Sequence, residues 1–74
     1  MYYMRVKIRL DTFKDAQQFA EIAERCDGWI HITDANGMCV NGKSILGALH
    51  AMEFTDIWCE SENDIYTKIQ NFVI

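Results

Sequence analysis

Strict alternation over residues 4–10 is the feature that most constrains how this chain of 74 residues can fold. The charged side chains of this segment are Arg5, Lys7 and Arg9. The apolar side chains around them are Met4, Val6, Ile8 and Leu10. A period of two places the two sets on opposite faces of a β-strand. The segment therefore predicts a half-buried strand with one charged face.

Three later segments have the spacing of amphipathic helices. In the first, Thr12 and Asp15 stand three residues apart and predict an N-terminal cap. In the second, Ser44 is the expected N-cap. In the third, Ser61 with Asp64 is the expected cap of a helix over residues 61–74. The apolar positions at helical spacing are Ala16, Phe19, Ala20, Ala23 and Cys26 in the first helix, Ile45, Ala48, Leu49 and Met52 in the second, and Ile65, Ile69, Phe72 and Val73 in the third.

Shorter segments predict the remaining strands. Residues 29–33 alternate, residues 34–37 have the turn sequence D-A-N-G, and residues 38–40 return, which together predict a β-hairpin. Residues 54–60 predict another strand. The expected order is β-α-β-β-α-β-α. We therefore expect a single domain over residues 1–74, an α+β open-faced β-sandwich with an antiparallel sheet and its helices on one face.

Charge and composition exclude several classes of function. The formal net charge is −4, and because a nucleic-acid surface needs a basic stripe, we expect no nucleic-acid partner. No stretch approaches the roughly 20 apolar residues of a membrane span, and we expect no membrane partner. The opening residues lack the apolar segment of a signal peptide.

Cysteine usage indicates the redox compartment. Cys26, Cys39 and Cys59 are an odd number without C-x-x-C spacing. That pattern argues against a disulfide framework or a zinc site. We expect three small buried thiols in a reduced cytoplasm, and neither a metal nor a cofactor.

Residues 37–44, G-M-C-V-N-G-K-S, match the phosphate-binding pattern G-x-x-x-x-G-K-[ST]. In a true phosphate-binding loop the first glycine follows a strand directly, and one loop runs from there to the helix. Here Gly37 belongs to the expected hairpin turn, and a strand separates it from Gly42. The two glycines are therefore not expected to surround one phosphate, and the match is interpreted as accidental.

The segment N-G-M-C-V-N-G-K-S-I-L-G-A-L resembles the middle of HPr, the histidine-containing phosphocarrier family of the bacterial sugar phosphotransferase system. It has an N-G turn, a short strand ending in V-N, and K-S-I-L-G at the start of a helix. The family has the same β-α-β-β-α-β-α order. Upstream, Ala16, Phe19, Ala23 and Ile30 also match the family's pattern, with Cys26 in an aromatic position. The resemblance implies an HPr-type fold and a protein that is not an enzyme.

The chain departs from HPr at the phosphoryl-transfer motif, G-[IL]-H-A-R-P-A. Thr12 stands where the resemblance puts the phosphorylated histidine, Lys14 where it puts the arginine, and Asp15 where it puts the proline. A threonine hydroxyl forms a stable phosphate ester, whereas a phosphorylated imidazole is labile. Lys14 lacks the bidentate fork of arginine. We therefore expect Thr12 and Lys14 to mark a former phosphoacceptor site without relay.

Ser44 is the residue that the resemblance connects with regulation. In one group of bacteria, HPr is phosphorylated at the serine of K-S-I by an ATP-dependent kinase. The catabolite-repression HPr keeps that serine and lacks the active histidine, as this chain does. The apolar docking patch of the family matches Ile45, Leu46 and Leu49 here. Ser44 is also explained by N-capping alone, and the three apolar residues by core packing alone.

Three functional hypotheses follow. The first is a regulatory or protein-docking module with phosphotransferase-system or regulatory protein partners. The second is a residual phosphocarrier that uses Thr12, His31 or His50, although His31 is expected on a polar strand face and His50 inside a helix. The third is a small interaction or oligomerisation domain unrelated to sugar transport.

Trp58, on the face that carries Asp56 and Glu60, is expected to cover the open sheet or to make a dimer contact. The oligomeric state stays open.

Overall fold

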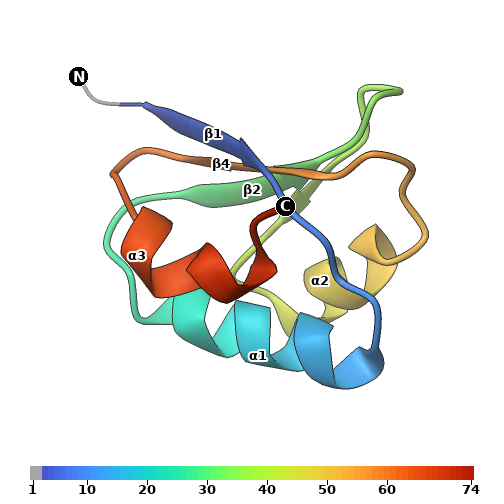
Figure 1. The fold of residues 1–74 in the computed structure, drawn as a ribbon, viewed down its shortest axis with the longest axis horizontal. Coiled ribbons are helices and arrows are strands. Elements are labelled where there is room, and N and C mark those ends of the chain that lie inside the picture. Colours follow the sequence, from blue (N-terminus) through green and yellow to red (C-terminus); the bar gives the residue numbers. More distant parts are fainter. Residues whose placement is uncertain (1–2) are drawn as a thin grey trace.

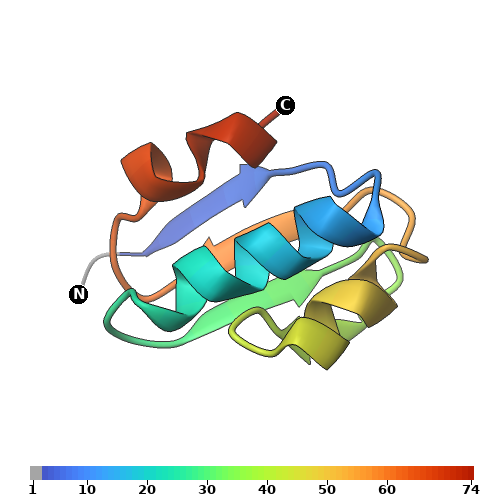
Figure 2. The same cartoon turned by 90° about the horizontal axis from the view of Figure 1, so that it is seen from below.

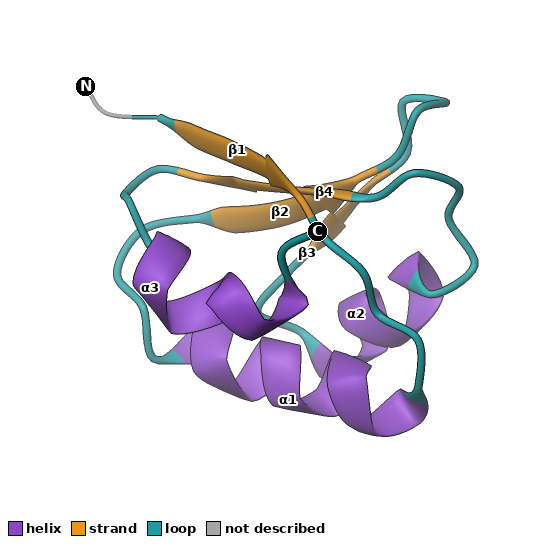
Figure 3. Cartoon of the chain, in the orientation of Figure 1, coloured by secondary structure: helices purple, strands orange, loops and turns teal. Residues whose placement is uncertain are grey.

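The computed structural model describes residues 3–74, so the first two residues of the expected domain lie outside the described part. The elements follow the expected order (Figure 1). They are β1 (Met4–Lys7), α1 (Phe13–Glu24), β2 (Ile30–Thr33), β3 (Cys39–Asn41), α2 (Ile45–Ala51), β4 (Trp58–Ser61), α3 (Tyr66–Ile69) and the 3-10 helix η1 (Gln70–Phe72). Figure 3 shows all of the helices on one side of the sheet, which leaves the other face open. The expected α+β open-faced sandwich is confirmed.

The sheet has the strand order β1-β4-β2-β3, and every neighbouring pair is antiparallel. Since β4 lies between β1 and β2, residues from both ends of the chain meet in the middle of the sheet. Arg5 pairs with Glu60, which pairs in turn with His31. The order makes β1 and β3 the two edge strands.

The C-terminal residues lie along part of the β1 edge. Ile8 forms an isolated antiparallel bridge with Val73. The N–H of Ile74 donates to the carbonyl of Lys7 (3.1 Å), and the N–H of Arg9 donates to the carbonyl of Phe72 (2.8 Å). This short pairing covers the outer side of the chain just beyond β1.

The core lies between the inner face of the sheet and the helices. Ile8, Ile30, Ile32 and Cys59 contribute from the sheet side, and Phe19 contributes from α1; all five are fully buried. The Phe19 ring meets that of Phe72 edge-on, with ring centroids 5.5 Å apart. Small residues on α1 and α2, namely Ala16, Ala20, Ala23, Ala48 and Ala51, let the helices approach the sheet closely.

The expected cap of the third helix is wrong. Ser61 is the last residue of β4, fully buried, paired with Met4 on one side and Ile30 on the other. Its hydroxyl donates to the carbonyl of Asn63 instead of capping a helix. Asp64 alone supports the helix start, accepting from the N–H of Tyr66 (3.0 Å). Two ladder partners and burial outweigh a local capping preference.

The expected boundaries also shift. The strand expected over residues 4–10 ends at Lys7, with an isolated bridge at Ile8. The helix over residues 61–74 is shorter, because α3 passes into η1 and Val73 turns extended (φ −75°, ψ 135°) to pair with Ile8. The strand expected from residue 54 begins at Trp58, because Asp56 has a left-handed backbone (φ 54°) that interrupts an extended chain. Within the described residues, no helix has the length and apolar character needed to span a bilayer.

Candidate functional site

The start of α1 is held by a reciprocal cap. Thr12 is the N-cap, and its Oγ1 accepts from the N–H of Asp15 (3.1 Å). The Asp15 Oδ2 accepts from the N–H groups of Thr12 (3.2 Å) and Asp11 (3.1 Å). This confirms the cap expected from the sequence. The Thr12 hydroxyl is therefore engaged with the backbone at the position expected for a phosphoacceptor.

A carboxylate already occupies the positive end of this helix. The free N–H groups of a helix start and the helix dipole favour an anion there. Asp15 supplies that negative charge from within the chain, and Arg9 nearby pairs with Asp11 (Nε to Oδ2, 3.0 Å). Lys14 and Phe13 are exposed, and the Phe13 side chain is 61% accessible. The Asp15 carboxylate therefore stabilises the start of α1 from within the chain.

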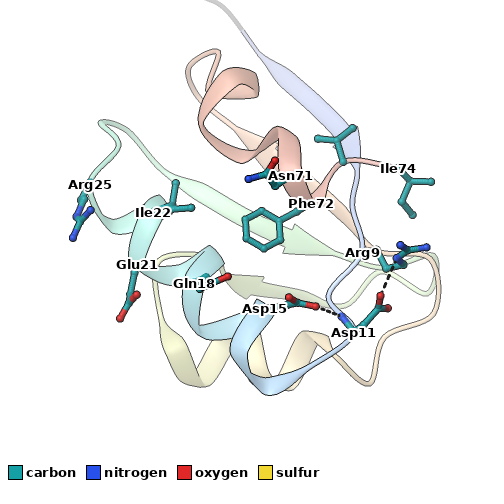
Figure 4. Close-up of a pocket in the computed structure, with 11 residues that line it drawn as sticks. Arg9, Asp11, Asp15, Gln18, Glu21, Ile22, Arg25, Asn71, Phe72 and Ile74 are labelled. Carbon is teal, nitrogen blue, oxygen red and sulfur yellow. Dashed lines mark hydrogen bonds and ion pairs between the residues drawn. The ribbon is translucent and has the colours of Figure 1, made fainter.

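A polar groove of about 570 Å³ runs from this helix start along α1 (Figure 4). Asp11 and Asp15 lie at one end of it, and Glu21 and Arg25 lie at the other. Phe72 and Ile22 form apolar parts of its wall. The sequence analysis did not predict this groove. It forms where α1 lies beside the C-terminal segment, and no local sequence pattern indicates a contact between these two distant parts of the chain.

The two histidines lie on elements other than α1. His31 lies in β2 on the open sheet face, where its ring stacks on Trp29 (centroids 4.9 Å apart, planes at 24°). His50 lies in the last turn of α2, with its ring centroid 5.5 Å from that of Phe54. Among the described residues, no hydrogen bond joins either ring to Thr12.

Ser44 caps α2 as expected. Its Oγ accepts from the N–H of Gly47 (3.2 Å), and its own N–H donates to the carbonyl of Asn41 (3.2 Å). The side chain is half-buried. Lys43 turns away from the cap and donates from Nζ to the carbonyl of Cys26 (2.7 Å). A Cβ at Gly47 would collide with the Asn41 carbonyl oxygen, which explains the glycine of K-S-I-L-G.

The three apolar residues proposed beside Ser44 divide between surface and core. Leu46 is 79% accessible and Ile45 is 42% accessible. Leu49 is half-buried and packs against the core. The structure therefore brings Ile45 and Leu46 together with Ser44 at the start of α2, whereas Leu49 belongs partly to the packing beneath the helix.

A network of side chains covers the open sheet face. The Arg5 guanidinium lies 4.0 Å above the centroid of the Trp58 ring and forms an ion pair with Glu60 (3.0 Å). Thr33 donates from its hydroxyl to the same carboxylate (3.3 Å). Trp58 thus covers the open face with Arg5, which is one of the two expectations for this residue. The alternation in β1 and β4 predicted the face but not these pairings.

The expected burial of all three thiols is corrected. Cys59 is fully buried, and burial raises the pKa of its thiol to about 12. Cys26 is half-buried, with its thiol donating to the carbonyl of Ile22. Cys39 is exposed, because the edge strand β3 carries it beside the hairpin turn. In residues 3–74, no three His, Cys, Asp or Glu side chains gather as a metal-binding group.

The glycines of the apparent phosphate-binding pattern are held apart. Gly37 has a left-handed backbone (φ 87°) in the turn between β2 and β3. Gly42 follows β3 and donates its N–H to the carbonyl of Ile30 (2.8 Å). A strand therefore separates the two glycines, as expected, and no continuous phosphate-cradling loop is formed.

Fold and site together define a small open-faced α+β sandwich with capped helix starts at Thr12 and Ser44. Two solved structures share this architecture. The chain is 25% identical to a phosphocarrier protein HPr from Bacillus anthracis str. Ames, over 95% of this chain and 88% of that chain, with a TM-score of 0.66. It is 20% identical to HPr-C-His from Thermoanaerobacter tengcongensis, over 99% of this chain and 91% of that chain, with a TM-score of 0.67.

The protein therefore has the HPr-like fold, nearly from end to end. The sequence matches no protein-family model and no curated protein.

Proposed function

We propose that this protein is an HPr-like regulatory or protein-docking module that has lost phosphoryl relay. The observation that carries the proposal is the engagement of the Thr12 hydroxyl with the N–H of Asp15 (3.1 Å) at the start of α1. Relay needs a group that accepts a phosphoryl and then releases it, as an imidazole does. A threonine ester is too stable for this, and the Asp15 carboxylate beside it repels a second anion. The protein would then act without a cofactor and not as an enzyme.

The start of α2 is the proposed docking surface. Ile45 and Leu46 expose apolar side chains beside Ser44, with Leu49 behind them. Exposed apolar side chains of this kind mark contact sites for other proteins. Phosphorylation of Ser44 would place a dianion at the helix start and change the partners that this surface accepts. The proposed partners are regulatory or phosphotransferase-system proteins in the cytoplasm.

The decisive experiment is the intact mass of the purified protein after two incubations. One contains phosphoenolpyruvate with the first enzyme of the phosphotransferase system, and the other contains ATP with the HPr serine kinase. We expect no phosphate in the first and one phosphate in the second. Ser44→Ala abolishes the second gain, whereas Thr67→Ala, which changes an exposed hydroxyl elsewhere, leaves it intact.

A phosphate gained from phosphoenolpyruvate would support the alternative of a residual phosphocarrier. Variants Thr12→Ala, His31→Gln and His50→Gln would then identify the acceptor. No gain in either incubation would favour the third hypothesis, an interaction or oligomerisation domain unrelated to sugar transport. Once a partner is identified, its affinity for the Leu46→Ser variant tests the proposed surface. Weaker binding would support a contact at the start of α2, and unchanged binding would point to a contact elsewhere on the molecule.

A further inference from the structure

Asparagine followed directly by glycine occurs twice in the chain, at Asn36–Gly37 and at Asn41–Gly42. The backbone nitrogen of the residue after an asparagine can attack the side-chain amide carbon, and glycine has no side chain to shield that nitrogen. Both dipeptides therefore have the covalent requirement for spontaneous deamidation. The fold places them in different surroundings, so they are not equivalent.

Asn36–Gly37 lies in the turn that joins β2 to β3. Figure 1 shows this turn projecting from one end of the sheet, and Figure 2, viewed from the helix side, shows it next to the segment that links α2 to β4. Residues 35–39 are all exposed. Nothing lies within 4 Å of the position that a Cβ at Gly37 would take, so a ring has room to close there. The N–H of Asn36 donates to Asp34 (2.9 Å), and among residues 3–74 no hydrogen bond holds its side-chain amide.

The two attacking nitrogens differ in how firmly their protons are held. The Gly37 N–H donates to the carbonyl of Asp34 at 3.3 Å, which is long for such a bond. The Gly42 N–H donates to the carbonyl of Ile30 at 2.8 Å, at the end of the pairing between β2 and β3. Because the nitrogen must lose its proton before it attacks, the shorter bond protects the asparagine before Gly42, whereas the longer one leaves Asn36 reactive.

Asn41 is also held by other contacts. Its Oδ1 accepts from the N–H of Lys43 (2.9 Å), and its carbonyl accepts from the N–H of Ser44 (3.2 Å). A Cβ at Gly42 would lie 2.8 Å from the Ile30 side chain, so the backbone there has little room to move. The side chain and backbone of Asn41 would have to leave these contacts before a ring could close.

We propose that Asn36 is a site of spontaneous deamidation in the folded protein and that the fold protects Asn41. The Gly37 nitrogen loses its proton and forms a bond to Cγ of Asn36, and the amide nitrogen of the side chain leaves as ammonia. The product is a cyclic succinimide. Water then breaks one of the two ring C–N bonds, which gives either aspartate or isoaspartate, in which the chain continues through the side-chain carbon. The overall change consumes one water and releases one ammonia.

The product changes both the charge and the length of the turn. Asp34 Oδ1 accepts from the N–H groups of Asn36 and Met38 (both 2.9 Å), so the new carboxylate appears in a turn that a carboxylate already organises. Repulsion between the two charges weakens these bonds, and isoaspartate adds a carbon to the backbone. Deamidation therefore loosens the end of the hairpin. The site does not involve Thr12 or Ser44, so its failure would leave the proposed function untouched.

The test incubates the folded protein at mildly alkaline pH and follows the conversion of amide to acid at each asparagine by peptide mapping. We expect Asn36 to react about tenfold faster than Asn41 or more, because a backbone hydrogen bond must open at Gly42. Asn71 is exposed but is followed by Phe72, and it should stay intact. In denaturant the rates at Asn36 and Asn41 should become similar, which separates protection by the fold from the chemistry of the dipeptide.

Two variants complete the test. Asn36→Gln, whose longer side chain closes the corresponding ring far less readily, should not accumulate the acidic species that ion-exchange chromatography resolves in the wild type. Asn36→Asp, which carries one of the two products, should show faster hydrogen exchange at the N–H of Met38 than Asn36→Gln does. Equal rates at Asn36 and Asn41 in the folded protein, or an intact Asn36 after the incubation, would overturn the proposed site. Unchanged exchange at Met38 would overturn the loosening of the turn.

Discussion

At the scale of single residues, the Thr12 hydroxyl satisfies a backbone N–H that the first turn of α1 would otherwise leave unpaired. Thr12→Ala is expected to lower the free energy of unfolding by about 1 kcal/mol, the usual effect of losing such a cap. Thr12→Ser, which keeps the hydroxyl, should stay near the wild type. Urea denaturation followed by circular dichroism measures both. An unchanged midpoint in Thr12→Ala would contradict the capping role.

Because the thiol of Cys59 is buried, we expect the stability of the protein to change with pH in the alkaline range. Burial raises the pKa of its thiol from 9.0 to about 12, so the unfolded chain releases this proton at a lower pH than the folded chain. The contribution of the thiol to stability is therefore complete below pH 9 and falls as the pH rises toward 12. Denaturation midpoints measured across this window should decline less steeply in Cys59→Ala. Equal slopes in the two proteins would refute the assignment.

The exposed Cys39 provides an internal reference for Cys59. Because reaction requires an accessible thiolate, an alkylating reagent at neutral pH should modify Cys39 in the folded protein and reach Cys59 only on unfolding. Peptide mapping after timed alkylation distinguishes the two sites. Modification of both at the same rate would show that the core around Cys59 opens readily.

At the scale of elements, the turn from β3 into α2 depends on a close approach that only glycine permits. A Cβ at residue 47 would meet the Asn41 carbonyl oxygen, so Gly47→Ala is expected to lower the free energy of unfolding by about 1–3 kcal/mol. Leu46→Ala changes the neighbouring exposed residue and should have little effect on stability. Thermal unfolding of the two variants makes the comparison. Unchanged stability of Gly47→Ala would mean that the turn can shift the Asn41 carbonyl away from the added Cβ.

Local patterns predicted some elements better than others for a physical reason. The start of α1 was predictable because both halves of its cap, Thr12 and Asp15, lie within one turn of sequence. Ser61 has an equally good local pattern, yet pairing with β1 and β2 places it in the sheet. Likewise the groove beside Phe72 arises from a contact between α1 and the C-terminal segment. Such long-range pairings have no signal in a single sequence.

At the scale of the whole molecule, the HPr-like fold is retained while the residues proposed to have ended relay are confined to one helix start. If the loss is local, then the combined variant Thr12→His, Lys14→Arg, Asp15→Pro should gain a phosphate from phosphoenolpyruvate and the first enzyme of the phosphotransferase system. Thr12→His alone should gain less, because the Asp15 carboxylate still opposes a phosphoryl group beside it. Intact mass over time measures the gain, with Thr12→Gln, Lys14→Arg, Asp15→Pro as the control without an acceptor.

The outcome depends on more than the acceptor, since the enzyme must also dock on the surrounding surface. Phe13 is exposed beside Thr12, and Leu46 is exposed at the start of α2. Circular dichroism establishes first that the combined variant is folded. A folded variant that stays unphosphorylated would show that the docking surface has diverged together with the acceptor. Phosphate transfer to the variant would show instead that the architecture still supports relay and that three side chains suffice to prevent it.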